Sequence, residues 1–153
     1  MFKSLGNFSD LVPLILRLGL GTTHVFSHGI PKLLEGPERW ESTGKAMANL
    51  GITFAPMFWG FMAGATEAVG GLLLILGLFV RPTSVVLLFV LFVAALQNLM
   101  TAGNLAGGRA HPLDAGFGLL AILILGAGKY SLERKWGLDK PVQTTVRQES
   151  KIA

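Results

Sequence analysis

The stretch that decides the fold is residues 57–80, MFWGFMAGATEAVGGLLLILGLFV, an apolar run of 24 residues with one ionisable side chain, Glu67. About 20 apolar residues in a helix are enough to cross the hydrocarbon core of a bilayer. A charged side chain at the centre of that core costs at least about 2.5 kcal/mol. We therefore expect Glu67 to be paired, protonated or functional.

The composition of the chain also indicates a membrane protein. Of its 153 residues, 51% are hydrophobic and only 14% are charged, whereas a soluble domain has about 25% charged residues. The net charge of +4 comes from scattered residues and lacks the pattern of a nucleic-acid groove, so no nucleic-acid partner is expected. The chain has no cysteine, which excludes disulfides, thiolate metal sites and dithiol redox relays.

Four segments are apolar enough to be membrane spans: 11–30, 57–80, 83–102 and 113–128. The second, third and fourth are joined by short links, so the expected fold is all-α, a transmembrane four-helix bundle with up-down topology. We expect residues 1–138 to form this single domain. Residues 139–153 are polar and are expected to form a disordered cytoplasmic tail.

The distribution of basic residues around the four segments predicts the orientation. Positive charge accumulates on the cytoplasmic side of a membrane protein. Both termini are accordingly expected in the cytoplasm, because eight basic residues flank one side and four the other: Lys3, Arg81, Lys129, Arg134, Lys135, Lys140, Arg147 and Lys151 against Lys32, Arg39, Lys45 and Arg109.

The long first connection, residues 31–55, contains a short amphipathic pattern. Trp40, Thr43, Met47 and Leu50 recur at helical spacing. This pattern predicts either a short helix on the outer membrane interface or an ordered loop with one helical turn. A lid over a site in the bundle is a further hypothesis.

Polar residues inside the spans form the candidate site. Arg17, His24 and His28 fall within about 40° on one helix face. Small residues surround Glu67 on its own helix, so it is expected to face a neighbouring helix. Arg17 is about 5 Å from Glu67 in depth, which predicts a central Arg17–Glu67 ion pair.

Four further polar residues are expected near the outer mouth of the bundle. They are Gln97, Asn98, His111 and Asp114. Convergent polar groups in an apolar cavity are typical of a ligand pocket.

Each group also has a structural explanation. The ion pair would fix helix register, the two amides would bond neighbouring helices, and Asp114 would cap its helix. His24 and His28 have a spacing that suits a divalent metal, but they lack a third ligand nearby in sequence. Hydrogen-bonded helix contacts are favoured for them, and no metal site is predicted.

Several stretches resemble the DoxX family. These are Leu16-Arg17-Leu18-Gly19-Leu20, Phe26-Ser27-His28-Gly29 with Lys32-Leu33, Glu67 to Pro82 (EAVGGLLLILGLFVRP), Asp114 to Leu120, and Gly126 to Leu132. The resemblance extends over residues 11–136. It implies a small four-helix protein of the bacterial cytoplasmic (inner) membrane, related to a subunit associated with thiosulfate:quinone oxidoreduction. The characteristic polar positions of the family match Arg17, His28, Glu67, Arg81 and Asp114.

Three functions are compatible with these residues. The first is an accessory or catalytic component of a quinone-linked redox system, in which Glu67 and His24 or His28 handle protons beside a bound quinone. A redox partner protein would then be required, and a homo-oligomer is left open. The alternative is a non-enzymatic membrane scaffold whose polar cluster is structural. Solute or proton transport is less favoured, because the sequence shows no strong inverted repeat.

Overall fold

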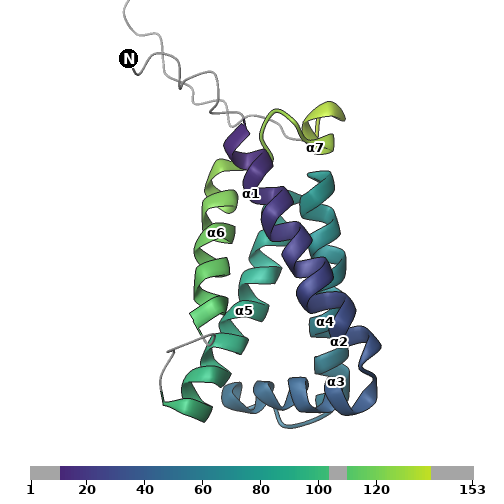
Figure 1. Ribbon diagram of the computed structural model, residues 1–153, viewed down its shortest axis with the longest axis vertical. Coiled ribbons are helices and arrows are strands. Elements are labelled where there is room, and N and C mark those ends of the chain that lie inside the picture. The colour runs from purple at the N-terminus through teal and green to yellow at the C-terminus, as the bar shows by residue number, and fades with distance from the viewer. Residues whose placement is uncertain (1–10, 104–109, 139–153) are drawn as a thin grey trace, which may run out of the picture.

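The computed structural model describes residues 11–103 and 110–138, and every regular element in these ranges is helical (Figure 1). The expected all-helical class is therefore confirmed, while the predicted tail, 139–153, lies outside the described residues. In chain order the elements are α1 (Leu11–Thr22), the π-helix η2 (Thr23–Gly29), α2 (Ile30–Leu34), α3 (Pro37–Gly44), the 3₁₀-helix η3 (Lys45–Leu50), α4 (Pro56–Leu76), α5 (Val80–Ala102), α6 (His111–Leu125) and α7 (Leu132–Lys135).

Two of these helices, α4 and α5, are long and apolar enough to cross a membrane. They have 21 and 23 residues and correspond to the predicted spans 57–80 and 83–102. The α6 helix is apolar but shorter, with 15 residues. The α4 helix ends at Leu76, earlier than predicted, because Gly77 adopts a left-handed conformation with φ of +68°.

The first helical segment is longer than the predicted 11–30. The elements α1, η2 and α2 follow one another without a break from residue 11 to residue 34. Inside η2, the amide of Ile30 donates to the carbonyl of Val25, five residues earlier. Such π-helical turns are rare and frequently occur at functional sites.

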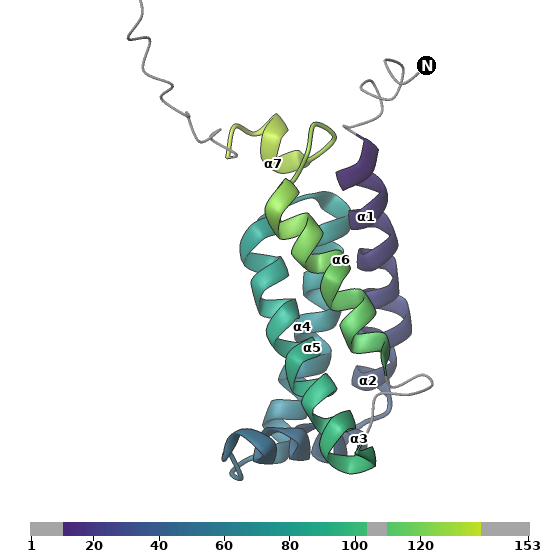
Figure 2. The ribbon, with the colours of Figure 1, turned by 90° about the vertical axis from the view of Figure 1, so that its left-hand side faces the viewer.

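The long helices lie side by side, with short helices at both ends of the molecule (Figures 1 and 2). We call these ends the α3 end and the α7 end. The α4 helix is central, because it contacts the first segment, α3 and α5, while α6 contacts α5 and α1. A cluster of buried apolar residues, including Leu74, Leu87 and Leu119, fills the space between α4, α5 and α6. The predicted short helix in the first connection is present as α3, followed by η3.

Glycines allow the central helix to lie directly against its neighbours. A Cβ on Gly71 of α4 would lie 2.7 Å from the carbonyl oxygen of Gly21 and 2.8 Å from Val25. A Cβ on Gly60, nearer the α3 end, would overlap the carbonyl of Trp40 in α3. The predicted packing face of small residues on the 57–80 helix is thus confirmed.

We predict that Gly71→Ala destabilises the fold and that Gly19→Ala does not. The added methyl at position 71 overlaps backbone of α1, and such overpacking costs about 1–3 kcal/mol. Gly19, also helical, has open space at its Cβ position, so alanine there gains up to about 1 kcal/mol in helix propensity. Unfolding curves in detergent test this, and equal unfolding free energies for the two variants would contradict the packing described.

Candidate functional site

A buried ion pair between Lys32 and Glu67 is the centre of the site. The Lys32 ammonium donates to both carboxylate oxygens of Glu67, with N–O distances of 2.8 and 2.6 Å. Glu67 is only 3% exposed, and the side chain of Lys32 is 19% exposed. The expectation that Glu67 is paired is therefore correct, and its partner is a lysine from α2.

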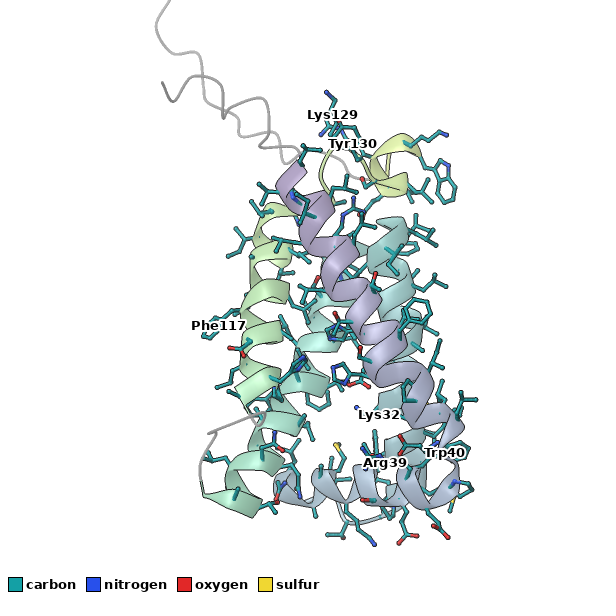
Figure 3. All side chains as sticks on the ribbon, viewed as in Figure 1. Lys32, Arg39, Trp40, Phe117, Lys129 and Tyr130 are labelled. Carbon is teal, nitrogen blue, oxygen red and sulfur yellow. The ribbon has the colours of Figure 1, made fainter. Side chains whose placement is uncertain are left out.

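Neighbouring elements hold this pair in place. Gly64, one helical turn before Glu67, gives room for the stem of Lys32, whose Cβ lies 3.2 Å from the position of a Cβ on Gly64. The indole N–H of Trp40 donates to the carbonyl oxygen of Lys32 at 2.8 Å. The Trp40 ring in turn packs against Phe61 of α4, with 5.1 Å between ring centroids. Lys32 and Trp40 are both seen toward the α3 end in Figure 3.

The predicted Arg17–Glu67 ion pair is wrong. Arg17 is fully buried, but its guanidinium lies near the α7 end, where Nη2 donates to the carbonyl of Tyr130 at 2.7 Å. The guanidinium also occupies the space that a Cβ on Gly77 would take. Gly77 is ten residues beyond Glu67, or about 15 Å along a helix. Arg17 therefore lies outside the candidate ligand pocket.

The direction of the side chains explains this error. Side chains on a helix tilt toward its N-terminus. The α1 helix starts at the α7 end and α4 starts at the α3 end (Figure 1). Arg17 and Glu67 consequently lean away from each other, even though their α-carbons are at similar depths in the sequence-based prediction. The same tilt brings Glu67 toward Lys32.

Arg17 joins three parts of the chain at the α7 end. It connects α1 to the link between α6 and α7 through Tyr130. In α7, the amide of Glu133 donates to the carbonyl of Gly77 at 3.0 Å, and its carboxylate accepts from the amide of Val80 at 3.1 Å. This network fastens the turn between α4 and α5. The buried arginine thus has a structural role here.

The three histidines lie together, as the sequence predicted for the outer cluster. The ring centroids of His24 and His28 are 6.1 Å apart, and those of His28 and His111 are 4.9 Å apart. His24 is fully buried, His28 is half-buried and His111 is exposed. The His24 ring is close enough to Glu67 and Lys32 to interact with their charges. The three histidines, Glu67 and Lys32 therefore form a single group of polar side chains.

The hydrogen bonds of Gln97 lie away from this group. Gln97 accepts a hydrogen bond from Asn49 of η3 at 2.6 Å and donates to Thr101 at 3.0 Å. It therefore links α5 to η3, in agreement with the structural explanation. Asn98 is half-buried on the same turn. Asp114 is exposed in the first turn of α6, whose N-cap is Ala110, so the predicted cap is wrong.

A cavity of about 360 Å³ adjoins the ion pair. It is bounded by η3 and the end of α3 on one side and by α4 and α5 on the other. We call it the Lys32 cavity. Its walls include Lys32, Thr43, Met47, Trp59, Thr66 and Phe89. The indole N–H of Trp59 is shielded from solvent and has no hydrogen-bond partner within residues 11–103 and 110–138. The cavity is thus apolar, with a few donors at its wall.

A second, larger hollow continues from this cavity along the surface. It has a volume of about 560 Å³ and runs between α4 and α5 toward Phe79 and Pro82. We call it the α4–α5 groove. Met62, Thr66 and Val86 line both hollows, so the two are adjacent.

No metal site is found in the described part of the chain. Within residues 11–103 and 110–138, no three histidine, aspartate or glutamate side chains converge as metal ligands do.

Sequence reasoning missed Lys32 and Trp59 as site residues. Lys32 lies beyond the predicted end of the first span, so it was interpreted as a flanking charge and as part of a stretch that resembles the DoxX family. The useful signal was its position eight residues after His24 and four after His28, which places the three side chains near one helix face. Trp59 was interpreted as an apolar residue of the predicted span 57–80.

Comparison with known proteins identifies one relationship. The sequence model of the DoxX family matches residues 12–101, which is more than half of the chain. Comparisons with curated proteins and with solved structures gave no match.

We predict that Lys32 and Glu67 are energetically coupled and that Arg17 and Glu67 are not. Removing one partner of a buried pair costs about 3–5 kcal/mol, and removing both costs less than the sum. Lys32→Met and Glu67→Met should therefore be strongly non-additive in a double-mutant cycle of unfolding free energies. Arg17→Met and Glu67→Met should add within about 0.5 kcal/mol. Additivity for Lys32 and Glu67 would refute the pairing.

Proposed function

The chain belongs to the DoxX family, and on this premise we propose that it is an integral membrane protein that binds a quinone in the Lys32 cavity and serves a quinone-linked redox system. The observation that carries this proposal is the cavity itself, which is lined mainly by apolar side chains and has Lys32 among its lining residues.

We place four helical segments across the bacterial cytoplasmic membrane, with both termini in the cytoplasm. The helices α4 and α5 have the length and hydropathy of spans, and the segment 11–34 is continuous. The α6 helix is about 22 Å long, so its span would include residues of the following link. Exposed aromatic residues near the two ends, Phe54 and Phe58 at one and Tyr130 and Trp136 at the other, suit the two membrane interfaces.

The donors of the Lys32 cavity match the acceptors of a quinone. A quinone has two carbonyl oxygens, which accept hydrogen bonds, on a flat apolar ring. Lysine has three donor hydrogens, and Glu67 accepts two hydrogen bonds from Lys32. One hydrogen of Lys32 is therefore left for a ligand. The N–H of Trp59 is buried and unpaired, so in this proposal the indole turns to present it to the ligand. The volume of about 360 Å³ lies within the usual range of ligand pockets.

The adjacent groove suits the tail of such a ligand. The α4–α5 groove is lined by apolar side chains such as Val69 and Leu73. It begins at the Lys32 cavity, with which it shares Met62 and Thr66. A quinone head group in the cavity would thus leave its isoprenoid tail in the groove, alongside lipid.

In this proposal a partner protein supplies the electrons, and the present chain supplies the binding site and the protons. Bound quinone provides the redox chemistry, which consumes protons on reduction. Glu67 and His24 adjoin the cavity through Lys32, so they are placed to accept or donate these protons.

A specific observation also favours the alternative, a non-enzymatic scaffold. Lys32 satisfies both oxygens of Glu67, and Arg17 ties α1 to the α6–α7 link. Both bonds hold helices together without a ligand. Under this alternative the cavity would contain lipid chains and no quinone.

We predict that a benzoquinone with a decyl tail binds the full chain in lipid nanodiscs. We expect Trp59→Phe to weaken this binding about five-fold, because the variant loses one hydrogen bond of about 1 kcal/mol. This substitution keeps an aromatic ring in the wall and removes only the N–H. Trp136→Phe is the matched control, because Trp136 is exposed at the α7 end. Calorimetric titration measures the affinities.

Two results would contradict the proposal. One is a wild-type protein that binds no more quinone than empty nanodiscs, which would support the scaffold. The other is equal loss of affinity in Trp59→Phe and Trp136→Phe, which would place binding outside the cavity.

A further inference from the structure

The three histidines of the chain form a row that runs from the surface into the interior. His111, the first residue of α6, is exposed, His28 is half-buried and His24 is fully buried. Successive ring centroids are 4.9 and 6.1 Å apart. We propose that this row is a proton-uptake path from the exposed His111 to His24, beside the Lys32–Glu67 pair. Its purpose rests on the proposed function, since quinone reduction consumes protons.

The hydrogen bonding of His24 leaves one ring nitrogen ready to take a proton. Its Nδ1 lies 2.8 Å from the carbonyl oxygen of Leu20. Because a carbonyl only accepts, Nδ1 carries the hydrogen and Nε2 carries the lone pair. This Nε2 is buried and has no partner in the described part of the chain. Leaving a buried acceptor unpaired is costly, so such a group needs an explanation, and proton acceptance provides one.

The middle ring also has an unpaired buried nitrogen. The Nε2 of His28 is also buried without a partner among the described residues. The rings of His28 and His111 are 4.9 Å apart between centroids, and Nε2 of His28 has no partner among the described residues, so a proton passes between them only after a ring rotation that brings two nitrogens to hydrogen-bond distance. The wider gap of 6.1 Å between His28 and His24 requires a ring rotation as well.

Charged and titratable groups of both signs lie near the row. His24 interacts with Glu67, which is negative, and with Lys32 and His111, which carry or acquire positive charge. His28 interacts with Lys32 and with the other two histidines. A proton taken up at Nε2 of His24 makes an imidazolium beside the Glu67 carboxylate. The same atom later releases that proton to an acceptor near the pair, while Nδ1 keeps its own hydrogen and donates it to the carbonyl oxygen of Leu20.

The π-helix accounts for the position of two of the rings. Both His24 and His28 belong to η2, and Thr23 and His24 donate to the carbonyls of Gly19 and Leu20, four residues earlier. If these two side chains served only to fill space, apolar side chains would do so without leaving a buried nitrogen unpaired. The π turn and the unpaired nitrogens are therefore independent features that converge on the same two residues.

The test measures how fast His24 exchanges its Nε2 proton, by ¹⁵N relaxation dispersion on histidine-labelled full-length protein in nanodiscs without quinone. We expect His28→Gln and His111→Ala each to slow this exchange at least ten-fold, and added imidazole to restore it in His111→Ala. Thr23→Val is the matched control on the same π-helix, because Thr23 is outside the row, and it should leave the rate unchanged.

An unchanged rate in His111→Ala would overturn the proposal. A slowed rate that imidazole does not restore would also overturn it, because the loss would then come from altered packing. Position 111 is exposed, so this variant keeps the test valid if His28→Gln does not fold. Since no quinone is present, failure here is distinct from failure of the quinone titration.

Discussion

The burial of the Glu67 carboxylate is the constraint on which the rest of the structure depends. A charge at 3% exposure needs a hydrogen-bonded partner of opposite sign, and Lys32 provides it at 2.6 Å. To bring Lys32 to this place, the first helical segment continues beyond residue 30 and lies directly on α4. Gly64 makes that contact possible by leaving room for the lysine stem. Trp40 then holds the carbonyl of Lys32 from α3.

The same pair connects the features that bear on function. Lys32 forms part of the wall of the 360 Å³ cavity, and Glu67 is within electrostatic range of His24. An apolar hollow with a few donors and a row of imidazoles therefore meet at one buried ion pair. The other buried cation, Arg17, lies at the far end and bonds Tyr130. Membership of the DoxX family agrees with a small membrane protein, and the arrangement of the α3 end supports a quinone site.

The sequence was sufficient for features that depend on local pattern, and insufficient for those that depend on three-dimensional direction. Hydropathy predicted α4 and α5, helical spacing predicted α3, and small residues around Glu67 predicted its packing face. The partner of Glu67 was assigned by depth alone, which ignores the opposite tilt of side chains on antiparallel helices. The π-helix could not be predicted, because no residue pattern specifies it. The walls of the Lys32 cavity come from several helices that are separate in the sequence, so no single stretch of sequence predicts the cavity.

The most direct test of the central claim is solid-state NMR of the protein in bilayers, measuring dipolar dephasing between lysine ¹⁵Nζ and glutamate ¹³Cδ. The measurement is made in a Lys45→Gln background, which removes the surface pair of Lys45 with Glu41. We expect strong dephasing that falls sharply in Glu67→Gln and persists in Arg17→Met. Dephasing that is absent, or that is unchanged in Glu67→Gln, would contradict the Lys32–Glu67 pair and the account built on it.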